Sequence, residues 1–188
     1  WRNTPITRLK DKPGTRESPT AEIHLRGAPA ELVGEPRSGV RQIAPMLNIT
    51  RTWNAVGALA TMRRCIALVR DFGNRRIVFG KPLAEQALFQ DTLAGMQAEY
   101  EAAFHLVFFV TELLGRVQCG QADESQQSLL RLLTPLAKLW TGKLAVAIAS
   151  EACECIGGVG YLEDSGIPQL LRDAQVWPIW EGASNVQA

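Results

Sequence analysis

Histidine is scarce in this sequence. Only two of its 188 residues are histidines, and His24 and His105 stand far apart with no cysteine beside either. A zinc finger needs closely spaced cysteine and histidine ligands, and a serine or cysteine nucleophile needs a histidine base. Those spacings, the His-Glu-x-x-His signature and the Walker phosphate-binding pattern are all absent. The sequence therefore predicts no metal site and none of the common nucleophilic hydrolases.

Long apolar runs and an excess of charge of one sign are missing too. No uninterrupted apolar run reaches the roughly 18 residues that span a bilayer, so we expect no membrane span. The 20 Lys and Arg residues balance 19 Asp and Glu residues. A net charge close to zero gives no long-range attraction for nucleic acid, and a nucleic-acid partner is therefore not expected.

The four cysteines are Cys65, Cys119, Cys153 and Cys155. A chain of this size, with 46% hydrophobic residues, needs no disulfide to hold a core, so we expect free thiols. This predicts an intracellular, reducing compartment, either the mitochondrial matrix or the cytoplasm. The sequence has no initial methionine and no secretory signal, and we expect it to belong to a longer protein.

Proline and glycine are concentrated in residues 1–40, where nine of them exclude a long helix. Residues 20–25 alternate small or apolar residues with polar ones, as a strand with one wet face does. Residues 4–9 and 30–33 are weaker strand candidates. Because an isolated hairpin is only marginally stable, we interpret residues 1–40 as the end of a β domain.

Residues 41–188 carry helical periodicity instead. Apolar residues recur at steps of three or four in three stripes, which predict three long helices packed in a bundle. The stripes run from Met46 to Phe72, from Leu83 to Leu114 and from Leu129 to Ile156. Residues 168–174 predict a short fourth helix. The fold class is therefore mainly α, a four-helix-bundle-type domain preceded by the end of a β domain.

Two prolines mark the predicted helices. Pro82 is expected in the first turn of the second helix, because proline fits there and not in a helix interior. Pro135, preceded by Thr134, either follows an N-cap or kinks the third helix.

Glu181 is the first candidate for chemistry. It stands between Trp177-Pro178-Ile179-Trp180 and Gly182-Ala183-Ser184-Asn185. A carboxylate beside large apolar rings loses hydration and becomes a candidate proton acceptor. The alternative is a surface glutamate without a catalytic role.

Two further segments could hold a ligand. Residues 75–82 place cations beside a helix start, a suitable site for phosphate, although a solvated turn is the alternative. Gly157, Gly158 and Gly160 follow a helix and not a strand, so they are not a dinucleotide fingerprint. They also suit a helix C-terminus that binds no ligand.

Taken in order, these segments resemble the C-terminal half of the acyl-CoA dehydrogenase family of flavoproteins. The resemblance rests on KDKPGTR (10–16), TAEI (20–23), LVGE (32–35), MLNITR (46–51), RIVFGKPL (76–83) with Gln86, ECIGGVGY (154–161) and WEG (180–182). The Leu133-Thr134-Pro135 segment and the WEG motif are similar to the branch that contains the bacterial alkylation-response protein.

The resemblance implies a three-domain fold. In it, residues 1–40 are the end of the middle β domain and residues 41–188 are the C-terminal helical bundle. It also implies an FAD cofactor and assembly as homodimers or homotetramers.

The resemblance gives Glu181 the role of the base that removes the α-proton of an acyl-CoA thioester, while a hydride leaves the β-carbon for the flavin. Some family members carry the base at the position of Thr50, where threonine cannot serve. On the substrate side, Arg51, Trp180 and Gly182 are implied to line the site near the base.

The resemblance also implies contacts with FAD. The FAD of a neighbouring subunit would be contacted by Arg76, Phe79 and Gln86, and its adenosine-diphosphate portion by Glu154, Cys155, Ile156, Gly157 and Gly158. The flavin of the same subunit would be contacted by Ser184 and Asn185. Two residues depart from the family pattern. Ala183 lacks a hydroxyl often present there, and Glu154 replaces a frequent glutamine.

The implied reaction is α,β-desaturation of a fatty acyl-CoA to trans-2-enoyl-CoA, with electrons passed to an acceptor such as an electron-transfer flavoprotein. The alternative is a flavin- or acyl-lipid-binding protein of the same fold, with a regulatory or nucleic-acid-protective role and little turnover. A third possibility is that this chain is simply a dimerising helical bundle.

Overall fold

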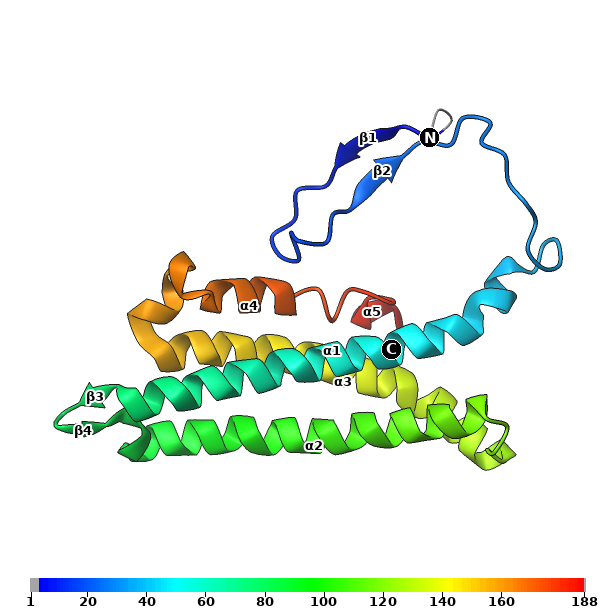
Figure 1. The fold of residues 1–188 in the computed structure, drawn as a ribbon. Helices are drawn as coiled ribbons and strands as arrows, with labels where there is room; N and C mark the ends of the chain where they lie inside the picture. Colours follow the sequence, from blue (N-terminus) through cyan, green and yellow to red (C-terminus); the bar gives the residue numbers. More distant parts are fainter. Residues whose placement is uncertain (1–3, 188) are drawn as a thin grey trace.

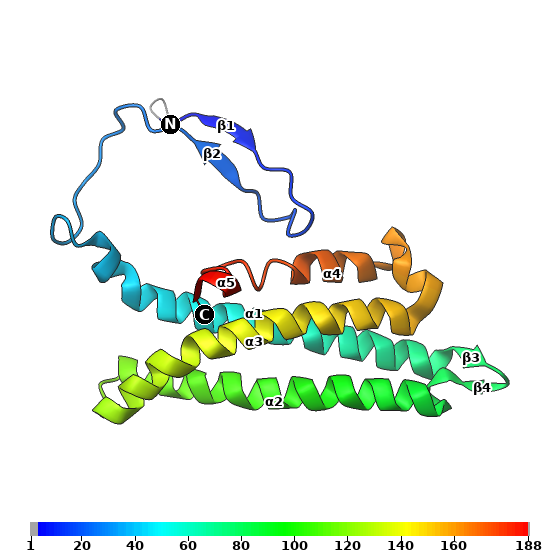
Figure 2. The same cartoon turned by 180° about the vertical axis from the view of Figure 1, so that it is seen from behind.

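Three long helices lie side by side in the computed structural model, which describes residues 4–187 and their side chains as far as Asn185 (Figure 1). They are α1 (Gly39–Arg75), α2 (Ala87–Gln118) and α3 (Glu124–Ile156). Two short helices, α4 (Ile167–Ala174) and α5 (Ser184–Gln187), lie along α1 and α3, as both views show (Figure 2). The prediction of a mainly α bundle is confirmed.

The ends of α3 follow from local chemistry. The Asp123 carboxylate accepts a hydrogen bond from the Gln126 amide at 2.7 Å, and the Gln126 side chain accepts one from the Asp123 amide at 3.2 Å. This reciprocal capping box satisfies two of the unpaired N–H groups at a helix start. The helix ends at Gly157, whose φ of 72° suits glycine and leads into η2 (Gly157–Tyr161).

Neither Pro135 nor Pro82 marks the start of an α-helix. Pro135 lies inside a continuous α3, so no new helix begins there, and the Thr134 hydroxyl donates to the Leu130 carbonyl at 2.8 Å. Pro82 lies in β4 (Lys81–Pro82), which pairs with β3 (Ile77–Val78) in a short hairpin. The turn η1 (Leu83–Glu85) then precedes α2. The prediction of Pro82 in the first turn of the second helix was wrong, because the hairpin takes up that position.

A second hairpin precedes the bundle. In it β1 (Ile6–Leu9) pairs antiparallel with β2 (Ala21–Ile23). The loop between these strands reaches α4, where the Thr15 amide donates to Asp173 Oδ1 at 2.5 Å. The weak strand candidate at residues 30–33 is not a strand, since both Leu32 and Val33 are exposed and no strand pairs with them in the described part of the chain.

The core lies where α1, α2 and α3 face one another. Its most buried apolar residues include Met62, Ile66, Val69, Val107, Val110 and Ile148. Several apolar residues of the predicted stripes are exposed instead, namely Met46, Trp53, Leu88, Phe104, Phe108, Leu132, Leu136 and Trp140. In the first half of α3 the buried face carries Thr134, Lys138 and Thr141. The apolar stripes therefore predicted the three helices correctly, but they predicted part of the buried face of each helix wrongly.

The membrane prediction needs a correction. By length and composition alone, one helical stretch among the described residues, Glu124–Tyr161, could cross a membrane. This stretch contains α3, which packs against α1, α2 and α4. A core helix of a soluble protein meets the same criterion, so the finding is weak support for a span. The lack of one long apolar run did not exclude it, because an average over a helix tolerates interspersed polar residues.

The cysteines are unpaired, as expected. All four thiols are free; Cys65 is buried, Cys119 is exposed, and Cys153 and Cys155 are half-buried. The described residues contain no group of histidine, cysteine and carboxylate side chains that could hold a metal ion.

Candidate active site

The segment that precedes Glu181 packs closely on α1 and α3. A Cβ atom added at Gly57 of α1 would lie 2.5 Å from the Trp177 ring, and one added at Gly142 of α3 would lie 3.0 Å from the Pro178 nitrogen. The Trp177 indole Nε1 donates to the Thr61 hydroxyl at 3.0 Å. The two glycines thus allow the segment to approach both helices, and the indole fixes its position on α1.

Glu181 is held at both its side chain and its backbone by neighbouring residues of α1. The Thr50 hydroxyl donates to Glu181 Oε2 at 2.6 Å, and the Arg51 guanidinium Nε donates to the Glu181 carbonyl at 3.2 Å. Glu181 is half-buried and has a φ of 60°, in the left-handed region that residues other than glycine rarely adopt. Such conformations persist where surrounding contacts impose them, which marks the turn as a constrained site.

The contact between Thr50 and Glu181 joins two positions that the family resemblance had already connected. The resemblance implies that both are positions at which family members carry the base, and here their side chains meet at 2.6 Å. In this chain Thr50 supplies a hydroxyl donor and Glu181 the carboxylate.

Lys138 of α3 lies beneath the same turn and was missed by the sequence analysis. Its side chain has no exposed surface, and its ammonium donates to the carbonyls of Pro178, at 3.2 Å, and of Gly182. Burial lowers the pKa of Lys138 and the nearby Arg51 charge lowers it further, whereas Glu181 acts in the opposite direction. The available signal was a lysine on the same helical face as Thr134 and Thr141.

The remaining predicted residues near Glu181 lie around the turn that carries it. Ser184 is buried, and its amide and hydroxyl both donate to the Pro178 carbonyl, at 3.1 and 3.3 Å. Asn185 is exposed. The Trp180 ring is 44% exposed and stands edge-on to the Trp177 ring, with centroids 6.2 Å apart. We refer to this region, with Thr50, Arg51, Lys138 and Glu181, as the base end.

The β3–β4 hairpin carries another group of predicted residues. The Phe79 side chain is 96% exposed and its φ is 51°, at the tip of the hairpin. Arg76 is exposed, and its guanidinium forms no ion pair within the described residues. Gln86 is half-buried and its side-chain amide donates to the Val78 carbonyl at 3.2 Å.

Glu154 to Gly158 lie at the same end of the bundle as this hairpin (Figure 1). A cavity of about 370 Å³ is lined by Phe79 and Gln86 from the hairpin side and by Glu154 and Cys155 from α3. Ile156 is buried and does not line it. Burial, and then the charges of Glu151 and Glu154, raise the pKa of the Cys155 thiol to about 11, so this thiol stays protonated at neutral pH.

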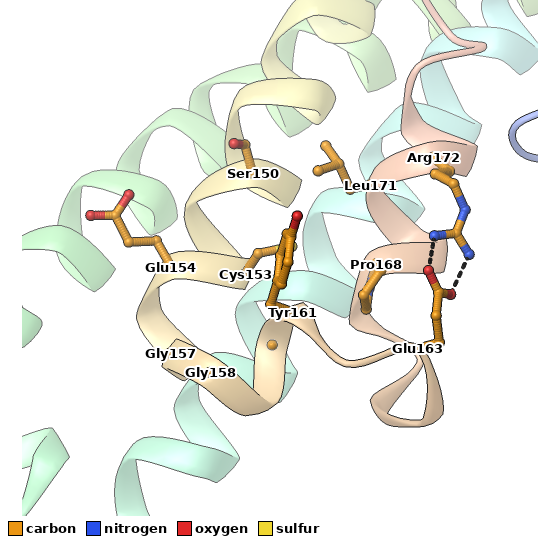
Figure 3. Close-up of a pocket in the computed structure, with 11 residues that line it drawn as sticks. Ser150, Cys153, Glu154, Gly157, Gly158, Tyr161, Glu163, Pro168, Leu171 and Arg172 are labelled. Atoms are coloured by element: carbon orange, nitrogen blue, oxygen red, sulfur yellow. Dashed lines mark hydrogen bonds and ion pairs between the residues drawn. The ribbon is translucent and has the colours of Figure 1, made fainter.

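A larger cavity of about 770 Å³ opens on the other side of Glu154 (Figure 3). Gly157 and Gly158 form part of its wall, and a Cβ atom at either glycine would meet nothing within 4 Å. Figure 3 shows Tyr161 at the cavity and Arg172 paired with Glu163 in two hydrogen bonds of 2.7 Å. We refer to the hairpin and these glycines as the cofactor end.

The residues of the cofactor end suit an anionic, planar ligand such as FAD in most respects. Arg76 offers an unpaired cation, Phe79 an exposed ring, and Gly157 and Gly158 open backbone that a ligand can approach. Glu154 does not fit an anionic ligand, because its carboxylate has the same sign of charge as a phosphate. The base end lies about 37 Å away along α1, since Arg51 and Arg76 are 25 residues apart. The structure therefore places the predicted residues in two separate groups.

Comparison with known proteins addresses the family directly. Residues 37–188 match the family described as acyl-CoA dehydrogenase, C-terminal domain. Acyl-CoA dehydrogenase family member 11 of Caenorhabditis elegans is 49% identical over 181 residues, which cover 96% of this chain and 29% of that protein. AidB of Escherichia coli strain K12 is 36% identical over 181 residues, covering 96% of this chain and 33% of that protein.

The solved structures agree. The crystal structure of Caenorhabditis elegans ACDH-11 in complex with C11-CoA superposes with a TM-score of 0.96 at 48% identity, covering 98% of this chain and 31% of that one. This chain thus spans about a third of the length of these relatives. Because the family match extends over more than half of its residues, the chain belongs to the acyl-CoA dehydrogenase family, whose members use FAD.

Proposed function

We propose that the protein containing this chain is an FAD-dependent acyl-CoA dehydrogenase that desaturates a fatty acyl-CoA to trans-2-enoyl-CoA. The observation that carries the proposal is the geometry of Glu181. Its carboxylate is half-buried, oriented by the Thr50 hydroxyl and fixed through its own backbone by Arg51. A catalytic base must be held where it can reach the proton that it removes, and this turn provides such restraint.

Glu181 acts in this proposal as the acceptor of the α-proton. Arg51 keeps the turn close to α1 through the Glu181 carbonyl, and Thr50 fixes one carboxylate oxygen, Oε2. Trp180 and Gly182, which flank the base, would border the thioester.

FAD, when bound, accepts the hydride from the β-carbon. Arg76, Phe79 and Gln86, together with residues 154–158, would hold it at the cofactor end, and Ser184 and Asn185 would contact the flavin near the base. Because the two groups lie far apart in one chain, we propose that a homodimer or homotetramer brings the cofactor end of one subunit to the base end of another.

The relatives support the substrate class. ACDH-11 was solved with C11-CoA, which is an acyl-CoA thioester. We therefore propose a fatty acyl-CoA as substrate and a separate electron-accepting protein, such as an electron-transfer flavoprotein, as partner.

The test is the visible absorption spectrum of the full-length protein, recorded during anaerobic addition of acyl-CoA thioesters of increasing chain length. We expect a flavin band that bleaches with one range of chain lengths. A flavin band that stays oxidised while the thioester binds would contradict dehydrogenation and favour a binding protein of the same fold, the alternative that the similarity to AidB suggests. Absence of flavin would overturn the cofactor assignment.

A further inference from the structure

Lys138 carries a buried charge that the proposed reaction does not use. Its side chain has no exposed surface, although it sits on a helix whose neighbouring buried positions hold alanine and threonine. Within the described residues no carboxylate forms an ion pair with it. A buried ammonium is costly unless hydrogen bonds compensate it, so its partners indicate what it does.

Those partners are two backbone carbonyls of one turn. Pro178 lies three residues before Glu181 and Gly182 directly after it, and both carbonyls accept hydrogen bonds from the Lys138 ammonium. A single side chain of α3 therefore bridges the two sides of the segment that carries the base. The Pro178 carbonyl also accepts from the Ser184 amide, which extends the same network to the start of α5.

We propose that Lys138 is a positioning residue for the base: its ammonium gathers the carbonyls of Pro178 and Gly182 and so holds Glu181 in its left-handed turn. This inference rests on the function proposed above. Thr50 and Arg51 of α1 hold the turn from one side, and Lys138 of α3 holds it from the other. The charged groups that face Lys138 are Arg51 and Glu181.

The geometry gives the lysine a role that an apolar residue cannot fill. Lys138 donates to two carbonyl oxygens at once, and a side chain without an N–H donor can replace neither hydrogen bond. Removing the ammonium would leave these oxygens without that donor, and Glu181, which is strained at a φ of 60°, would lose a restraint on its conformation. The chemical step should then slow while substrate binding is retained.

The test uses the full-length holoprotein with Lys138→Met, which keeps an unbranched side chain of nearly the same length without a donor, and Lys138→Gln, which keeps an N–H donor. Lys143→Met is the matched control, because Lys143 lies on the same helix and is exposed. Anaerobic flavin reduction by an acyl-CoA gives the rate constant and its dependence on substrate concentration. Hydrogen–deuterium exchange of the amides in residues 177–184 reports the turn independently of turnover.

We expect Lys138→Met to slow flavin reduction about tenfold or more, with the half-saturating acyl-CoA concentration changed less than about twofold. The amides of the turn, including that of Ser184, should exchange faster. We expect Lys138→Gln to recover part of both effects and Lys143→Met to change neither.

Wild-type rates in Lys138→Met, or a loss confined to substrate affinity, would overturn the proposal. If Lys138→Met fails to fold, the test rests on Lys138→Gln. Wild-type amide exchange together with wild-type rates in Lys138→Gln would then overturn the proposal. If the wild-type flavin is not reduced by any acyl-CoA, the proposed function fails, and the exchange of the turn still shows whether Lys138 holds it.

Discussion

The two ends of the bundle are built differently. At the base end, side chains from α1 and α3 hold one turn from two sides, two glycines are closely covered, and a lysine has no exposed surface. At the cofactor end, Phe79 is almost fully exposed, Arg76 has no ion pair in the described residues, and two glycines face open space. One end is organised within the chain, whereas the other, in the described part of the chain, presents an exposed ring, a cation without an ion pair and open backbone.

This difference fits the two roles that the proposed function gives to these ends. Proton transfer needs a base held within a narrow range of positions, and the base end provides restraint from both helices. Binding a large anionic cofactor needs cations and open backbone, and their partners can come from the ligand and from another subunit. Substitutions at the base end should therefore impair the chemistry or the stability, depending on the residue, and those at the cofactor end should impair ligand binding alone.

The sharpest test of that contrast is Glu181→Gln. The amide keeps the size of the side chain but cannot take up the α-proton, so we expect flavin reduction by acyl-CoA to slow by about 10³-fold. The melting temperature should stay close to that of the wild type. Glu154→Gln at the cofactor end is the control and should retain the rate. Unchanged turnover in Glu181→Gln would show that another group is the base.

Gly57→Ala tests whether the base end depends on close packing. The new Cβ would meet the Trp177 ring at 2.5 Å, so the ring must move and its bond to Thr61 must lengthen. We expect the free energy of unfolding to fall by about 1–3 kcal/mol. In α2, an alanine at Gly95 meets nothing within 4 Å, and Gly95→Ala should stabilise by about 0.5–1 kcal/mol. Equal effects in urea denaturation would contradict the packing argument.

Cys65 lies on α1 between the two ends and makes the stability of the shared core depend on pH. Burial, and then the neighbouring Cys153, raise the pKa of its thiol from 9.0 to about 11. The unfolded thiol ionises above pH 9 while the folded one stays protonated, so the stability that Cys65 contributes is lost as pH rises through about 11. We expect a loss of about 3 kcal/mol across this range, using 1.36 kcal/mol for each pKa unit.

The measurement is urea denaturation between pH 8 and pH 11, with the range set by the pKa shift of Cys65. Cys65→Ala should show a shallower alkaline decline than the wild type, whereas Cys119→Ala, at an exposed position, should not. Identical slopes in all three proteins would show that another group governs alkaline stability.

Arg76→Ala should have the smallest effect on the fold. Its exposed side chain makes no ion pair in the described residues, so we expect the free energy of unfolding to change by less than about 0.5 kcal/mol. If Arg76 contacts FAD phosphate or ring atoms, FAD should bind about tenfold more weakly, as expected for loss of a charge-assisted hydrogen bond. Arg75, which is paired with Asp71, is the matched control, and Arg75→Ala should bind FAD as the wild type does.

The sequence predicted the helices well because each needs only local signals. The glycines after Ile156 and the periodic apolar residues are enough to place α3 within a residue or two. It did not predict which face of α3 is buried. Leu132 and Leu136 are exposed while Thr134 and Lys138 are buried, because the segment of residues 177–182 returns to cover the small and polar side.

The candidate site shows the same limit. Motif order predicted Glu181 and Arg51, and the structure brings them together. Lys138 gave no motif, since the role proposed for it depends on two carbonyl groups that any residue could supply. Contacts made through the backbone of a distant segment leave little trace in the sequence of either partner.

Helix α1 adds a constraint that neither end shows alone. It runs without a break from Gly39 to Arg75 and connects the partners of the base to the hairpin of the cofactor end. Each residue of a helix adds about 1.5 Å of length and about 100° of rotation. The number of residues in the helix therefore sets both the distance between the two ends and their relative rotation about the helix axis. An insertion of one residue between Met62 and Val69 would leave both ends chemically intact and turn them out of step with each other.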